Sequence, residues 1–190
     1  MKSYRLWAAL TLAVMMLVLS GCLNMESKEY RFSVKPDGSG EGKILFNNIV
    51  SQDDDGNDVS EADFSELIDG YIEGNAWEED HPGYNVTGKR LFVEDGKLMG
   101  EITFTFTALD SIGFLTFPGC DCAPILYQLG QMDESYRESN GKTMGDANNP
   151  SFIAWDSGTK EFAFQTTVLG DMEGTRSLAK QYQEWEAGKK

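Results

Sequence analysis

The stretch Glu101-Ile102-Thr103-Phe104-Thr105-Phe106-Thr107 has the most regular two-residue alternation in this chain of 190 residues. Large apolar side chains alternate with polar ones, so Ile102, Phe104 and Phe106 lie on one face of an extended strand. The threonines lie on the opposite face, towards solvent or a neighbouring layer. We therefore expect a β-strand that presents one apolar face to a core.

The sequence predicts three hairpins whose strands show this kind of alternation. In each, two alternating segments flank a short turn that contains Asp and Gly, and glycine accepts the positive φ angles that tight turns need. The hairpins are predicted at residues 30–50, 85–107 and 152–168, with their turns at residues 36–40, 94–97 and 156–159. The stretch quoted above is the second strand of the middle hairpin.

Two segments have helical spacing instead, with apolar residues three and four apart. The two apolar stripes are Phe64, Leu67, Ile68, Tyr71 and Ile72, and Leu178, Tyr182 and Trp185. We expect the first helix to be capped by Asp58 or Ser60 and to end at Gly74. The second helix is expected from about Thr175 to Glu186.

The region between residues 108 and 150 has weaker patterns. Residues 109–114 fit a short helix capped by Asp110 or Ser111, and residues 125–129 are an apolar run that fits no single element type. Residues 133–150 are polar and typical of a surface loop or a weak hairpin around Asn140-Gly141.

These elements predict an α+β fold: an antiparallel β-sheet built from about three hairpins and covered by two or three helices. Antiparallel pairing is expected because the chain lacks the βαβ rhythm of buried apolar strands. A half-open barrel with helices plugging its ends is the alternative.

The N-terminus has the composition of a secretory signal. Lys2 and Arg5 precede a charge-free run, Leu6 to Leu19, of 14 residues. A membrane span needs about 20 apolar residues, whereas a run of this length is typical of a cleaved signal peptide.

That run ends in Leu19-Ser20-Gly21-Cys22, which resembles the lipobox of bacterial membrane lipoproteins. The resemblance implies a diacylglyceryl group on the thiol of Cys22 and cleavage between Gly21 and Cys22. It also implies that the new N-terminus is often acylated. An Asp after the cysteine resembles an inner-membrane retention signal, so Leu23 implies the outer membrane in a Gram-negative host.

The expected organisation is therefore a lipoprotein signal peptide (1–21), a lipidated cysteine with a short tether (22–27) and a single α+β domain (28–190). Each acyl CH2 buried in a bilayer contributes about 0.8 kcal/mol, so two or three chains on one cysteine give lasting attachment. We expect an exported, lipid-anchored protein of the bacterial cell envelope, whose partner is the membrane through that covalent lipid.

The negative charge of the chain disfavours some classes of binding partner. The formal charge is −15, and loss of Lys2 and Arg5 with the signal leaves 14 basic against 31 acidic residues, a charge of −17. Such a domain repels phosphate backbones and anionic headgroups. Nucleic-acid binding is therefore not expected, and the lipid must hold the protein at the membrane.

Two cysteines remain besides Cys22. Cys120 and Cys122 are two residues apart, and in a straight strand their Cα atoms would be about 7 Å apart, at the limit for a disulfide. A kink at Pro118-Gly119 would shorten that distance, so a disulfide between them is the leading prediction for an exported protein. Free thiols, or a metal site with Met132 as a copper(I) ligand, are the alternatives.

The acidic residues 53–58 invite a calcium interpretation, but the EF-hand pattern fails. With Gly56 as its sixth position, Ser51 occupies the first position and Ala62 the twelfth, where carboxylates are needed,. A looser calcium loop is the alternative to a solvated loop. The single histidine, His81, follows Glu78 to Asp80 and is a weak candidate metal ligand.

The sequence predicts no catalytic residue, cofactor or metal site. The chain lacks the G-x-S-x-G, P-loop, dinucleotide and H-E-x-x-H patterns,. We expect a non-catalytic binding or assembly module that binds an envelope protein or a small ligand. The alternative is a periplasmic or extracellular hydrolase that uses a pair of carboxylates.

Overall fold

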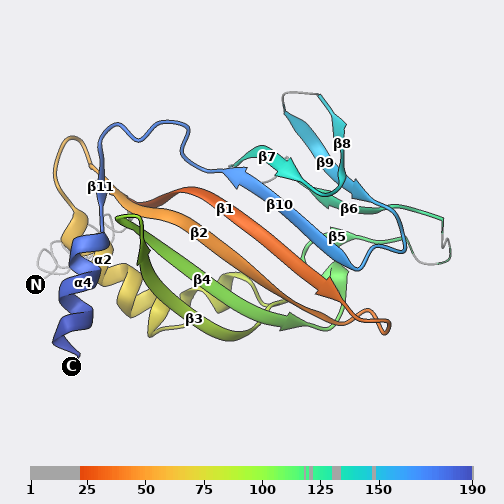
Figure 1. Cartoon of the computed structure of the whole chain (residues 1–190), viewed down its shortest axis with the longest axis horizontal. Coiled ribbons are helices and arrows are strands. Elements are labelled where there is room, and N and C mark those ends of the chain that lie inside the picture. Colours follow the sequence, from red (N-terminus) through yellow and green to blue (C-terminus); the bar gives the residue numbers. More distant parts are fainter. Residues whose placement is uncertain (1–21, 118, 120–121, 130–133, 147–148, 190) are drawn as a thin grey trace, which may run out of the picture.

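The computed structural model describes residues 22–117, 119, 122–129, 134–146 and 149–189 (Figure 1). The predicted signal peptide with Gly21, and the candidates Cys120 and Met132, lie outside the described residues. Every strand pair in the described part is antiparallel. The chain is mainly β, with short helices, so the α+β class holds in this coarse form.

The larger sheet has seven strands in the order β3-β4-β2-β1-β10-β7, with β11 paired to the far end of β2. The strands are β1 (Leu23–Val34), β2 (Gly40–Gln52), β3 (Asn85–Glu94), β4 (Lys97–Phe106), β7 (Ser135–Ser139), β10 (Glu161–Thr167) and β11 (Thr175–Ser177). Strands β3 and β7 end this order, so the large sheet has two open edges among the described strands.

A smaller sheet has the order β5-β6-β9-β8. Its strands are β5 (Phe114–Leu115), β6 (Ile125–Gln128), β8 (Lys142–Gly145) and β9 (Pro150–Trp155). The helices are α2 (Ser60–Glu66), which continues as the π-helix η1 (Leu67–Ile72), α3 (Ala76–Asp80), the 3-10 helix η2 (Leu109–Ile112) and α4 (Ala179–Gly188). In Figure 1, α2 and α4 lie where β1 begins, and β8 and β9 lie at the opposite end of the large sheet.

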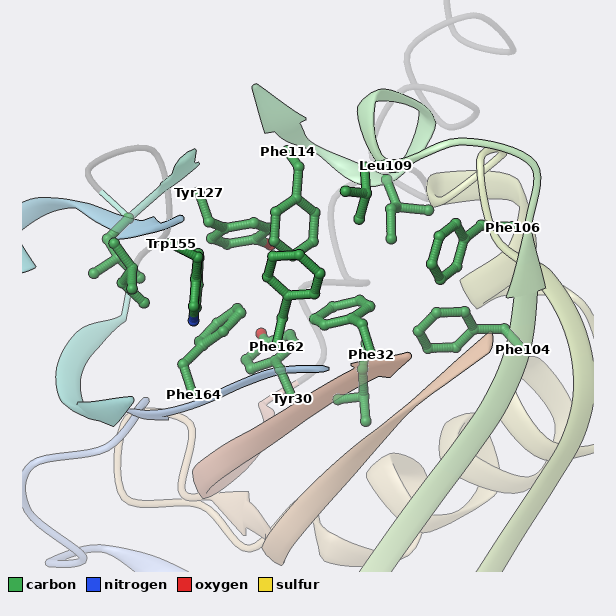
Figure 2. Packing of buried hydrophobic residues seen from close by; sticks show 14 of the residues in the cluster. Tyr30, Phe32, Phe104, Phe106, Leu109, Phe114, Tyr127, Trp155, Phe162 and Phe164 are labelled. Atoms are coloured by element: carbon green, nitrogen blue, oxygen red, sulfur yellow. The ribbon is translucent and has the colours of Figure 1, made fainter. Parts of the chain in front are cut away.

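The predicted alternation places the core on one face of the large sheet. Ile102, Phe104 and Phe106 are at most 7% exposed. Figure 2 shows aromatic side chains from the small sheet pointing towards this face. The ring of Phe114 packs edge-on against Phe32 of β1, with 5.1 Å between ring centroids. Edge-to-face packing of this kind adds to the hydrophobic gain from burial.

Two glycines of β2 allow these rings to lie directly on the sheet. A Cβ atom at Gly40 would lie 2.3 Å from the ring of Phe106, and one at Gly42 would lie 2.7 Å from the ring of Phe104. The glycines therefore make room for the aromatic core where side chains would exclude it.

A single left-handed residue in β2 changes which side chains of this strand face the core, and the core thereby extends towards the helices. Asn48 has a φ of 54°, a left-handed conformation that asparagine tolerates better than most residues. Phe46 and Ile49, three residues apart, consequently pack in the same hydrophobic cluster, together with Leu67 and Tyr182 of the helices.

The first two hairpins are confirmed, but the prediction of a third hairpin is wrong. The turn at residues 156–159 joins β9 to β10, and these strands belong to different sheets. Strand β9 pairs with β6 and β8, whereas β10 pairs with β1 and β7. The same happens at Asn140-Gly141, where β7 and β8 separate into the two sheets.

The prediction of a short tether at residues 22–27 is also wrong. Leu23 pairs with Ser51 and Ser27 pairs with Asn47, so this segment is the first part of β1. The reason is the length of β2, which continues to Gln52 and offers backbone partners to those residues. Strand β1 therefore begins one residue after Cys22.

The helix predictions hold with changes at their ends. The first helix covers 60–72; its N-cap is Val59, and the carboxylate of Asp58 accepts the backbone N–H of Ser60 at 3.0 Å. The C-terminal helix begins at Ala179 and not at Thr175, because residues 175–177 pair with β2 as a strand. Its predicted stripe is buried at Leu178 and Tyr182.

The weakly patterned regions contain short elements. Residues 109–112 form a 3-10 helix, the apolar run after Pro124 is strand β6, and the polar region contains strands β7 and β8. Helix α3 was not predicted, because five residues are too few to show helical periodicity.

Candidate functional site

A cavity of about 300 Å³ lies between the large sheet and the helical layer formed by α2, η1 and α3. We call it the sheet–helix cavity. Its apolar wall includes Leu23, Met25, Phe46, Ile49, Leu67 and Ile72. Lys28, Glu66, Asp80 and His81 add polar and charged groups to the lining. An apolar chamber with a few polar groups is the usual form of a small-molecule site.

The helical layer is tied to the sheet by one lysine of β3. The ammonium of Lys89 donates to Glu78 of α3 at 2.8 Å and to the carbonyl oxygen of Gly74 at 2.6 Å. The side chain of Lys89 is only 12% exposed. Ion pairs of limited solvent access are screened less than surface pairs, so this contact fixes the position of α3 over the cavity.

The single histidine lies against an aromatic ring of the cavity. The rings of His81 and Trp77 are stacked with 4.2 Å between centroids, and Nδ1 of His81 is 2.8 Å from the carbonyl oxygen of Trp77. Within the described residues, no group of three or more His, Cys, Asp or Glu side chains could hold a metal ion. The arrangement gives His81 a packing role at the edge of the cavity.

Next to the cavity, a buried carboxylate in the segment before β7 joins that segment to two strands, β1 and β10. Glu134, whose side chain is 7% exposed, accepts a hydrogen bond from the ammonium of Lys28 at 2.6 Å. The hydroxyl groups of Tyr30 and Thr166 also donate to it. Burial, with the nearby negative charge of Glu134, holds the pKa of Tyr30 well above its usual range, so the phenol remains a hydrogen-bond donor.

Sequence reasoning missed this network. Lys28 lies at the predicted start of the domain and Glu134 in the polar segment 133–150, and neither position differs in sequence pattern from an exposed one. The signal that could have been used is Tyr30, whose hydroxyl needs a partner once the alternation of β1 buries it.

Cys22, the predicted lipidation site, immediately precedes β1. Its backbone N–H donates to Oδ1 of Asp63 on α2 at 3.2 Å, and its carbonyl oxygen accepts from the N–H of Gln52 at 2.8 Å. Partial burial, followed by the negative charges of Asp54 and Asp63, raises the pKa of the Cys22 thiol.

Cys122 is the other cysteine that the structure describes. Cys122 is disulfide-bonded, but the predicted partner, Cys120, lies outside the described residues, so the pairing of these two cysteines stays a prediction. Neither Cys122 nor any residue of the acidic segment 53–58 lines the sheet–helix cavity.

The acidic segment contacts a cation from a distant part of the chain, Arg176 of β11. Asp53 accepts two hydrogen bonds from the guanidinium of Arg176, at 2.7 and 3.1 Å, and Asp58 lies 3.4 Å from the same group. Asp54 pairs through its backbone with Asn57. These contacts fit the solvated-loop interpretation better than a calcium loop.

The part of the chain described here contains no helix with the length and hydropathy that crossing a bilayer requires. Comparisons with protein-family models, with curated proteins and with solved structures find no match to the chain.

Proposed function

We propose that this chain is a cell-envelope lipoprotein, anchored by lipid on Cys22, whose folded domain is a non-catalytic binding module. Its ligand is a small, largely apolar molecule with a polar group, held in the sheet–helix cavity. The observation that carries this proposal is the cavity itself.

The size and lining of the cavity support ligand binding. Interiors of small domains are packed with few voids larger than a water molecule, whereas this cavity of about 300 Å³ reaches the lower end of the range for small-molecule pockets. Leu67 and Ile72 provide apolar surface, and Lys28 provides a charged group that can orient a polar end of the ligand.

The position of the cavity supports a link to the membrane. Leu23 and Met25 line it, and they follow Cys22 by one and three residues. One residue of extended chain spans at most about 3.5 Å, so a lipid on Cys22 would hold the cavity close to the bilayer surface. An apolar ligand taken from, or delivered to, that surface would travel a short distance.

The cavity is tested by filling it. Ile72→Trp places a larger side chain in the lining, whereas Leu45→Trp, on the opposite face of β2 next to Ile44, is the matched control. Titration with the neutral dye Nile red should show binding to the wild type and to Leu45→Trp, and a loss of binding to Ile72→Trp. Equal dye binding by all three proteins contradicts the proposal.

The anchor is tested separately. Replacement of Cys22 by Ala should release the protein from membranes or leave its signal uncleaved. A processed protein that still sediments with membranes would contradict the predicted lipidation.

A carboxylate-dependent hydrolase is the second candidate, and one observation favours it. Glu66 and Asp80 both line the cavity, as an acid–base pair would have to do. Purified protein would be assayed on chromogenic esters and glycosides. Activity that disappears in both Glu66→Gln and Asp80→Asn supports this candidate over the binding module.

A further inference from the structure

The start of β1 lies beside two buried polar atoms that have no hydrogen-bond partner. These atoms, Oδ2 of Asp63 and Oγ of Ser51, are the ones with this property among the described side chains. Asp63 is 3% exposed and Ser51 is 0% exposed. Ser51 pairs with Leu23, and Oδ1 of Asp63 is 3.2 Å from the backbone nitrogen of Cys22.

A half-satisfied buried carboxylate is costly. A buried polar group without a partner costs about 1–3 kcal/mol, and more when it is charged. Asp63 forms no ion pair with a lysine or arginine in the described part of the chain; Arg176, the cation paired with nearby acids, contacts Asp53 and Asp58. The backbone amide of Cys22 has a single N–H, which serves Oδ1 and leaves Oδ2 bare.

We infer that Asp63 is the binding site for the unacylated α-amino group of Cys22 in the processed protein. The inference rests on the proposed function, because the amino group exists only after cleavage. Hydrolysis of the peptide bond before Cys22 adds water: the leaving signal peptide gains a carboxylate, and the nitrogen of Cys22 becomes a primary amine, protonated at neutral pH.

An ammonium group fits Asp63 where an amide does not. It offers three N–H donors and a positive charge, so it can donate to Oδ1 and Oδ2 together. Alpha-amino groups ordinarily titrate at about pH 7.7–8.0, and a neighbouring carboxylate favours their charged form. Attachment of a third acyl chain would return the nitrogen to an amide with one N–H and no charge.

The surroundings hold the amino group in place. The carbonyl oxygen of Cys22 is fixed by the N–H of Gln52, and its nitrogen by Asp63 on α2. The mature protein is thus expected to carry two acyl chains, both on the diacylglyceryl group of the sulfur, and an α-amino group bound between β1 and α2.

The experiment is intact-mass analysis of the full-length protein, produced in a bacterium with the complete lipoprotein acylation pathway and purified from membranes. N-terminal labelling with an amine reagent follows denaturation. A chain that starts at Cys22 with two acyl chains and a labelled N-terminus is expected. A third acyl chain on the nitrogen overturns the inference and leaves the proposed anchoring intact. An unprocessed chain, or one without lipid, overturns the anchoring itself.

A pair of variants tests the role of Asp63. Asp63→Asn removes the negative charge, and Asp69→Asn makes the same change at an exposed position of the same helical segment. Asp63→Asn should acquire the third acyl chain and lose its N-terminal label, while Asp69→Asn should match the wild type. If Asp63→Asn keeps a labelled N-terminus with two chains, Asp63 does not bind the amino group. If Asp63→Asn fails to fold, the intact mass of the wild-type protein alone tests the inference: two acyl chains support it and three contradict it.

Discussion

The indole Nε1 of Trp155 donates a hydrogen bond to the side-chain oxygen of Asn140 at 2.7 Å. That oxygen also accepts the backbone N–H of Ala163 at 2.9 Å, and the amide of Asn140 donates to the carbonyl oxygen of Glu161 at 2.9 Å. Trp155 belongs to the small sheet and Ala163 to the large one. Asn140 therefore holds the two sheets together where the chain crosses between them.

Replacement of Asn140 by Ala should destabilise the protein strongly. Three hydrogen bonds are lost, and the indole N–H of Trp155, which is 4% exposed, is left without its acceptor. The expected loss is about 2–3 kcal/mol of unfolding free energy, measured by urea unfolding. Asn85→Ala, which removes an exposed hydrogen bond to Thr105, is the control and should cost less than about 0.5 kcal/mol. Similar losses in both variants would show that Asn140 does not join the sheets.

The residue after Asn140 should tolerate no side chain. A Cβ at Gly141 would lie 2.7 Å from Cγ2 of Ile153 and from the ring of Trp155, and both residues are buried. Gly141→Ala is expected to lower the melting temperature, with a cost of about 1–3 kcal/mol for overpacking. Gly158→Ala, where nothing lies within 4 Å, should leave the melting temperature unchanged; equal melting of the two variants contradicts the prediction.

The buried pair of Lys28 and Glu134 should behave as a unit. Lys28→Met leaves the carboxylate of Glu134 buried without its cation, which typically costs about 3–5 kcal/mol. Adding Glu134→Gln removes the stranded charge, so the double variant should be more stable than Lys28→Met alone. Urea unfolding of the double-mutant cycle measures this coupling.

The control for that cycle is an exposed pair on α4. Lys180 and Glu184 are 83% and 67% exposed, and surface pairs contribute about 0–1 kcal/mol. Lys180→Met should therefore cost little. Additive effects of Lys28→Met and Glu134→Gln would rule out the coupling at the buried pair.

The tyrosines of the core should make the fold sensitive to alkali. Burial raises the pKa of Tyr84 to about 12, whereas an unfolded tyrosine ionises near pH 10. A raised pKa in the folded state gives stability that is complete below about pH 10 and is lost as the pH rises to about 12, by up to about 2 kcal/mol.

Tyr84→Phe removes this dependence at one position. The variant loses the hydrogen bond to the carbonyl oxygen of Ile112, so it should be less stable than the wild type at neutral pH. Between about pH 10 and pH 12 its stability should fall less steeply than that of the wild type. Unfolding followed together with tyrosinate absorbance checks this, and parallel pH profiles would refute it.

Local periodicity determined much of the fold. The alternation at residues 101–107 and the turn at 94–97 define a hairpin whose strands are neighbours in sequence, and the stripe within residues 60–72 defines a helix. Such patterns act over a few residues, because the geometry of a strand or a helix fixes which neighbours share a face. The hairpin and the helix could therefore be predicted without knowledge of any distant segment. The lipidation of Cys22 likewise follows from a short motif and stays a prediction.

Only the tertiary structure decided which sheet each strand joins. Strands β9 and β10 are connected by a turn that fits a hairpin, yet β10 pairs with β1, more than a hundred residues away. The cavity, the contact of Lys28 with Glu134 and that of Cys22 with Asp63 depend on the same long-range packing. A strand can pair with any other edge of suitable length. The choice depends on the total burial of aromatic side chains between the layers, which no local pattern of residues encodes.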